Sequence, residues 1–184
     1  MSTKVKATIE DLYEEKGKAE LIDGEIQKFM PTGRRPSRAS FNIALSLMEH
    51  ERTHGGGVAV ADNAGFIVDL PKRESFSPDA AWFAGAMDTN DDMDFFDGAP
   101  VFAVEVRSKN DYGAKAEREM AEKRRDYFAA GTLVVWDVDL LGEEIIKAYK
   151  ADTPERPVIF KRGETANAEP AVPGWQMPVD DLFR

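Results

Sequence analysis

Two acidic side chains stand where apolar strands are expected, and their type and placement suit the binding of a cation. Glu105 lies inside residues 101–106, a continuous apolar run typical of a buried strand. Asp79 opens a second such run over residues 77–83. A carboxylate in such a strand is costly to bury unless it is paired or bound to a metal. A structural pair with a buried Arg or Lys would explain one acid, but acids recur at several strand ends, which favours a hard cation.

A lysine and a third acid complete the set of candidate residues. Lys123 shares a helical stripe with apolar Met120 and Tyr127, so we expect it to point toward the sheet that carries Glu105. The alternative is that Lys123 runs along the helix edge to water, beside neighbouring arginines. Glu20 begins a strand-like run before a turn, and by itself this position indicates a surface residue.

The elements that must position these residues can be read from periodicity and turn signals. Thr8 and Asp11 predict a capping box for a helix over residues 8–15, and Asp23-Gly24 predicts a hairpin over residues 20–29. A strand at 101–107, a helix at 111–131 and a strand at 133–138 predict a βαβ unit with a right-handed crossover.

The remaining predicted elements frame this unit. They are a helix over 37–53 with an apolar stripe of Phe41, Ala44, Leu45, Leu47 and Met48, strands over 58–60, 65–70, 144–149 and 157–160, an acidic surface loop over 88–97, and an irregular tail with a last turn over 179–183. The expected fold class is α/β, a mixed sheet flanked by helices, with an N-terminal helix and a β-hairpin.

Length and composition set outer limits on function. The chain has 184 residues with 42% hydrophobic content, which predicts a single domain over residues 1–184. It has no cysteine, which excludes thiolate chemistry and fits a reducing cytoplasm. The N-terminal residues are polar and no apolar run is long enough for a bilayer, so we expect a cytoplasmic protein without a membrane partner. The net charge of −10 argues against broad attraction to nucleic acid.

Two further clusters have competing interpretations. Arg34, Arg35 and Arg38 form the clearest basic cluster and could reach phosphates, although a solvated helix start is the usual meaning of such a run. His50 and His54 have the spacing of a zinc pair on a helix. Without further His or Cys nearby, a solvated helix end is the better interpretation.

A series of short motifs in fixed order resembles a known family. The motifs are Glu20-Leu21-Ile22-Asp23-Gly24-Glu25, Pro31-Thr32-Gly33, Ser77-Pro78-Asp79, Val104-Glu105-Val106-Arg107-Ser108 with Asp111, Lys123 and Tyr127 before Ala130-Gly131, Trp136-Asp137-Val138-Asp139, Pro173-Gly174-Trp175 and Leu182-Phe183. Their combination resembles the Uma-two-type restriction endonucleases, a branch of the PD-(D/E)XK nuclease superfamily, over nearly the whole chain.

The resemblance implies a restriction-endonuclease-like core and metal-dependent cleavage of DNA. Pro78-Asp79 matches the PD element, and Glu105 matches the acid of (D/E)XK, but Arg107 stands where the lysine is usual. Lys123 matches a lysine that replaces it from the following helix, and Lys109 is the competing candidate. Glu20 matches the N-terminal active-site Glu of the family.

In that scheme Asp79 and Glu105, with Glu20 and the Val106 carbonyl, hold Mg²⁺ or Mn²⁺, and Lys123 orients or helps to deprotonate the attacking water. Arg107 joins the arginine cluster as a candidate DNA contact. Rival hypotheses are a catalytically degenerate DNA- or protein-binding module of the same fold, and a nuclease for RNA or branched DNA. A homodimer would fit duplex cleavage, which needs two active sites or two visits.

Overall fold

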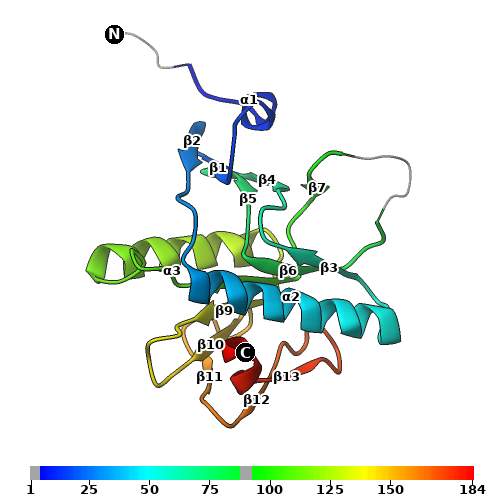
Figure 1. The fold of residues 1–184 in the computed structure, drawn as a ribbon. Coiled ribbons are helices and arrows are strands. Elements are labelled where there is room, and N and C mark those ends of the chain that lie inside the picture. Colours follow the sequence, from blue (N-terminus) through cyan, green and yellow to red (C-terminus); the bar gives the residue numbers. More distant parts are fainter. Residues whose placement is uncertain (1–4, 88–92) are drawn as a thin grey trace.

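The computed structural model describes residues 5–87 and 93–184 and has a mixed α/β architecture (Figure 1). A six-stranded sheet has the strand order β11-β10-β9-β8-β6-β3. All neighbouring pairs are antiparallel except β8 and β9, which are parallel. In the same order, the strands are Val158–Phe160, Ile146–Lys150, Val134–Val138, Phe102–Val106, Ala80–Phe83 and Val58–Ala61.

The parallel pair is joined by helix α3 (Ala114–Ala129), so the predicted βαβ unit is confirmed. Glu105 lies beside Asp137 in the register of β8 and β9, near the carboxyl ends of both strands. Just after the helix, Gly131 has φ 105°, a backbone conformation that glycine adopts without strain. This residue lets the chain turn directly from α3 into β9.

One face of the sheet is covered by α2 (Arg34–His54) and the C-terminal segment. That segment consists of β12 (Thr165–Asn167), β13 (Gln176–Pro178) and the 3-10 helix η1 (Val179–Phe183), which lie together at one end of the molecule (Figure 1). All three tryptophans of the chain, Trp82, Trp136 and Trp175, belong to this core. Packing on this side is therefore largely apolar, and Glu51 of α2 accepts the Ala59 N–H of β3 at 2.7 Å.

The opposite face packs against α3 and a three-stranded sheet of order β5-β4-β7. These strands are Arg73–Phe76, Phe66–Leu70 and Phe96–Asp97, in that order. Ala103 of β8 is buried on this side with Tyr127 of α3. Because side chains alternate along a strand, Glu105 lies on the same face as Ala103 and beneath α3.

The N-terminal part forms α1 (Ile9–Tyr13) and the hairpin of β1 (Ala19–Ile22) and β2 (Glu25–Lys28). The predicted capping box is present in both directions between Thr8 and Asp11. Asp23 and Gly24 have φ of 50° and 71°, as a two-residue hairpin turn requires. The Leu21 N–H donates to Ser75 Oγ at 2.7 Å, which ties the hairpin to β5.

Some predictions about elements are wrong. In α2, Ala44 and Leu47 of the predicted stripe are buried, but Phe41, Leu45 and Met48 are 53%, 53% and 42% exposed, and the buried side also carries Ala39 and Ile43. The predicted stripe was therefore too wide, because it included large apolar residues that lie on the exposed side of the helix. Strand β5 and the β12–β13 pair were not predicted, and residues 88–92 of the predicted acidic loop lie outside the described residues.

Candidate active site

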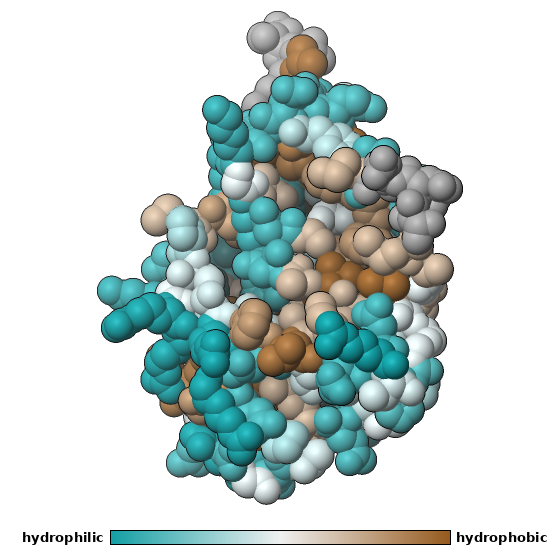
Figure 2. Space-filling model, turned by 45° about the vertical axis from the view of Figure 1, so that its right-hand side comes forward, coloured by the Kyte–Doolittle hydropathy of each residue, from teal (hydrophilic) through white to brown (hydrophobic). Residues whose placement is uncertain are grey.

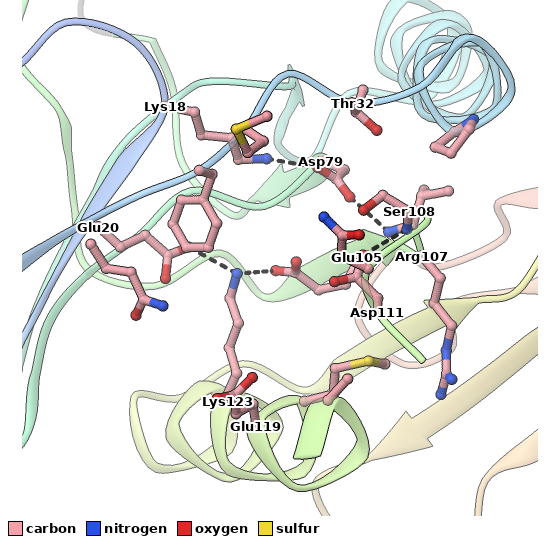
Figure 3. Close-up of a pocket in the computed structure, with 18 of the residues that line it drawn as sticks. Lys18, Glu20, Thr32, Asp79, Glu105, Arg107, Ser108, Asp111, Glu119 and Lys123 are labelled. Carbon is pink, nitrogen blue, oxygen red and sulfur yellow. Dashed lines mark hydrogen bonds and ion pairs between the residues drawn. The ribbon is translucent and has the colours of Figure 1, made fainter. Parts of the chain in front are cut away.

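A cleft of about 1490 Å³ opens between the N-terminal hairpin, α3 and the carboxyl ends of β8 and β9. Among the described residues, eleven Lys and Arg and ten Asp and Glu line it, whereas the whole chain has a net charge of −10. Basic residues are therefore enriched around the cleft. Hydrophilic side chains cover much of the face in Figure 2, with smaller apolar patches between them. The cleft brings together most of the residues singled out from the sequence (Figure 3).

Asp79 enters the cleft from the residue before β6. Its N–H donates to the Val104 carbonyl at 2.9 Å, which fixes its backbone beside β8. Its Oδ2 accepts the Val106 N–H at 2.7 Å, and its Oδ1 lies 2.6 Å from Lys18 Nζ. Lys18, which precedes β1, also lies 2.7 Å from Asp62. Burial opposes the charged form of Lys18, but Asp79 and Glu105 outweigh it and raise its pKa.

Glu105 enters the same cleft from the end of β8, with a side chain that is 24% exposed. Its Oε1 accepts the Tyr127 hydroxyl at 2.7 Å and lies 2.8 Å from Lys123 Nζ. Among the described residues, no hydrogen bond or ion pair reaches its other oxygen. Burial raises the pKa of Glu105, and Asp79 raises it further against the pull of Lys123. One carboxylate oxygen is thus available to a ligand in the cleft.

Lys123 points inward from α3, as its helical stripe predicts. Its ammonium lies 2.8 Å from both Glu20 and Glu105 (Figure 3). The side chain is only 16% exposed, so the alternative in which it runs to open water is excluded. Burial would lower the pKa of Lys123, but Glu105 and Glu20 hold it above its ordinary value. Lys123 is therefore a fixed positive charge at neutral pH.

Glu20 is fully buried behind Lys123, which contradicts the surface position that its local sequence indicates. Its Oε1 accepts the Ser77 N–H at 2.9 Å and pairs with Lys123, and its Oε2 accepts Arg73 Nη1 at 2.7 Å. Burial works against its charge, but Lys123 and Arg73 hold its pKa below the ordinary value. With both oxygens engaged, Glu20 holds Lys123 in place and is not a metal ligand in this geometry.

Two residues that support the site were not singled out as doing so. Arg73 of β5 binds Glu20 and, through Nε, Asp126 at 2.8 Å. In the sequence Arg73 is one basic residue in a polar stretch after Pro71-Lys72, and nothing there indicates a buried role. Tyr127 was assigned to the apolar stripe and the family motif, yet it donates its hydroxyl to Glu105 while its ring stacks on Phe76 at 4.0 Å. Burial and the nearby Glu105 raise the pKa of Tyr127 well above its ordinary value.

Arg107, at the usual lysine position, is bound elsewhere. Its guanidinium donates to both oxygens of Asp137, each at 2.7 Å, and it also pairs with Glu117 of α3. Only 8% of the residue is exposed. This side chain bridges β8, β9 and α3, and with its charge neutralised by two acids its geometry does not support the predicted DNA contact. Lys109, the competing lysine, is exposed at the cleft.

The other basic and histidine candidates separate in space. Arg34, Arg35 and Arg38 are all exposed, but of the three only Arg35 lines the cleft, while Arg38 donates to the Arg184 carbonyl at 3.0 Å. The His50 and His54 rings stack with centroids 4.4 Å apart, and His50 packs edge-on against Trp82. Burial, followed by His54, lowers the pKa of His50. His50 therefore packs against the core, which the expected solvated helix end did not predict, whereas His54 is exposed at that end.

The donor set of the cleft fits a hard cation with few protein ligands. Within the described residues, no three His, Cys, Asp or Glu side chains are grouped as a metal site. Glu20 is fully buried with both oxygens engaged, whereas, among the described residues, Glu105 keeps one oxygen free and Asp79 Oδ1 is held only by the Lys18 side chain. These two acids and the Val106 carbonyl, all at the cleft, remain as candidate ligands. Oxygen donors suit Mg²⁺, which keeps several of its waters and therefore needs few ligands from the protein.

The family model described as putative restriction endonuclease, Uma2, matches residues 7–180. The chain belongs to this family. The Uma2 match spans every element that contributes to the cleft, from the hairpin to α3 and β9. A crystal structure of a putative nuclease belonging to DUF820 from Anabaena variabilis ATCC 29413 has a similar fold, with a TM-score of 0.73 and 17% identity over 96% of this chain and 97% of that one. No curated protein matches the sequence.

The structural similarity confirms the mixed α/β fold of this Uma2 protein. None of the helices in the described part of the chain is both long enough and apolar enough to cross a bilayer.

Proposed function

We propose that this protein is a metal-dependent endonuclease that hydrolyses DNA phosphodiester bonds. The observation that carries the proposal is the meeting of Asp79, Glu105 and Lys123 in one cleft, with buried Glu20 behind the lysine. Two carboxylates from adjacent strand ends and a fixed cation are the groups that in-line hydrolysis of a phosphodiester requires. The basic residues around the cleft supply contacts for phosphates.

Asp79, Glu105 and the Val106 carbonyl would hold Mg²⁺ or Mn²⁺. The bound ion would neutralise phosphoryl charge and lower the pKa of a bound water. Lys123 is kept protonated by its two carboxylates, so its role is to orient the water and stabilise growing negative charge rather than to act as a base. Tyr127 fixes the Glu105 carboxylate by donating to Oε1, which leaves the other oxygen for the ion.

The test is a cleavage assay on duplex, single-stranded and branched DNA and on RNA, at low salt. We expect nicking or cutting of DNA with Mg²⁺ or Mn²⁺, and none with EDTA or in Asp79→Ala. Ca²⁺ should support binding without cutting, because its larger and looser shell activates water poorly. Cleavage of RNA or branched DNA alone would reassign the substrate but keep the chemistry.

A degenerate binding module is the second candidate, and one observation favours it. Each acid of the site already has a cation of its own: Lys18 beside Asp79, Lys123 beside Glu105, and Arg73 beside Glu20. Because the charge of each acid is offset by a cation, the site is stable without a metal ion. If wild type and Asp79→Ala are equally inactive on all substrates, yet one substrate binds tightly in EDTA, this candidate replaces the nuclease. A homodimer stays a prediction.

A further inference from the structure

Lys18 is a partly buried lysine of the cleft that contacts a proposed metal ligand and has no role in the proposed reaction. Its side chain, 20% exposed, reaches from the residue before β1 to Asp79, 2.6 Å away, and to Asp62, 2.7 Å away. Asp79 and Asp62 are 18% and 39% exposed, so the three groups form an ion network from the bottom of the cleft to its rim. Figure 3 shows the Lys18 ammonium directed at the Asp79 carboxylate.

The two oxygens of Asp79 differ in what holds them. Oδ2 accepts the Val106 N–H of β8, a backbone contact fixed by the sheet. Oδ1 is held only by the ammonium at the end of a flexible side chain, as far as the described residues extend. A divalent cation beside Asp79 would face the charge of Lys18 at close range, and like charges at such distances repel strongly in a partly buried site. Lys18 is therefore the group that a cation has to displace.

The chain also provides a place for the displaced ammonium. The Lys18 backbone is fixed, because its carbonyl accepts the Phe29 N–H at 2.9 Å across the base of the hairpin. Asp62 accepts a hydrogen bond from the same ammonium and lies farther toward solvent. A small rotation of the side chain would break the bond to Asp79 and keep the bond to Asp62. The motion needs no change in the backbone.

We propose that Lys18 is a built-in counter-ion that occupies the Asp79 side of the site in the absence of metal, and that a divalent cation displaces it toward Asp62. The inference rests on the proposed metal-binding role of Asp79. If this is so, Lys18 lowers the affinity of the site for a divalent cation. Metal binding is then coupled to the position of the Lys18 side chain at the base of the hairpin.

The test measures Mn²⁺ binding by isothermal titration calorimetry on the full chain, with no nucleic acid present. Lys18→Met keeps the length of the side chain and removes its charge, so we expect the Kd for Mn²⁺ to fall about tenfold, within the usual range of coupling between two sites. Lys28→Met is the matched control, since Lys28 is on the same hairpin, lines the cleft and is 61% exposed beside Glu15. Its Kd should equal that of wild type.

A double-mutant cycle separates displacement from simple attraction. Asp62→Asn removes the alternative partner and should weaken Mn²⁺ binding in the wild-type background. In the Lys18→Met background the same change should have no effect, because there is no Lys18 ammonium left for Asp62 to bind. An equal effect in both backgrounds would mean that Asp62 only attracts the ion through space, and would overturn the proposal.

The remaining outcomes are also decisive. If wild type binds Mn²⁺ in an Asp79-dependent way and Lys18→Met, folded by circular dichroism, binds it no tighter, the Lys18 inference fails and the metal site stands. If neither protein binds Mn²⁺, the proposed metal chemistry fails and the inference falls with it. Should Lys18→Met not fold, Lys18→Gln replaces it, with the same expected direction.

Discussion

Lys123 separates two carboxylates that would otherwise repel each other in a buried space. It pairs with Glu20 and Glu105, which come from the N-terminal hairpin and from β8. The Lys123 ammonium thus has two roles: it compensates the charge of the buried carboxylates, and it takes part in the proposed reaction. Stability and activity should respond together when it is changed.

Replacing Lys123 with Met should abolish cleavage and lower the free energy of unfolding by about 3 kcal/mol, the scale of breaking a buried ion pair. Activity is measured below the melting temperature, and stability by urea titration. Lys115→Met is the control on the same helix, since Lys115 is 82% exposed and pairs with Glu119 at 3.5 Å. It should change stability by less than about 0.5 kcal/mol. Wild-type cleavage by a folded Lys123→Met protein would contradict its role.

Glu20 should make the protein sensitive to acid. Its folded-state pKa is below the ordinary value of 4.5, so its contribution to stability is present above that pH and is lost as the pH falls below it. The melting temperature of wild type should therefore fall more steeply below pH 4.5 than that of Glu20→Gln, because the glutamine side chain does not take up a proton. Calorimetry across that range gives the comparison, and parallel curves would refute the assignment.

At the scale of elements, the sequence predicted the parts with strong periodicity or turn chemistry. The βαβ unit, the Asp23-Gly24 turn and the capped first helix were all located, because each depends on local signals. The inward direction of Lys123 followed from its stripe with Tyr127. These local signals explain why Asp79, Glu105 and Lys123 were found together.

Other features depend on contacts that no local pattern encodes. Arg73 acts through Glu20, 53 residues away in the chain, and nothing near either residue indicates the pair. Glu20 looks like a surface residue in its own strand and is buried only because Arg73 and Lys123 neutralise it. Arg107 was predicted to contact DNA because of its position in a motif, whereas the orientation of its side chain depends on Asp137 and Glu117.

Strand β5 should be essential to the stability of the site through one side chain. Arg73→Met removes a partner of fully buried Glu20 and should cost about 3 kcal/mol or more, because it leaves a buried charge undercompensated. Its neighbour Lys72 is exposed, and Lys72→Met should be nearly neutral. Urea denaturation of both variants gives the difference. Equal stabilities would show that Lys123 alone is enough for Glu20.

At the scale of the whole molecule, charge is distributed unevenly. The chain is strongly acidic, yet its cleft has slightly more basic than acidic residues among those described. Nucleic acid should therefore approach by one face and be repelled by others. Binding that depends on so few cations should be weak and sensitive to salt.

Salt dependence can identify the binding face. Lys109→Ala and Arg125→Ala, both at the cleft, should weaken DNA binding and each reduce the slope of log Kd against log salt by about one unit. Arg52, an exposed residue near the end of α2, does not line the cleft, and Arg52→Ala should leave the slope unchanged. Fluorescence anisotropy in Ca²⁺ measures binding without cutting. A reduced slope for Arg52→Ala would place DNA elsewhere.

The tie between the N-terminal hairpin and β5 has a consequence for when the proposed site is complete. Glu20 and Lys123 are far apart in the chain, and they pair in a fold whose hairpin is tied to β5 by the Leu21–Ser75 hydrogen bond. A chain in which this hairpin has opened would no longer hold Lys123 against Glu20. Hydrogen exchange at the Leu21 amide should report this opening, and activity should be lost in step with it. Closure of the hairpin onto β5 would then be the step that completes the proposed catalytic site.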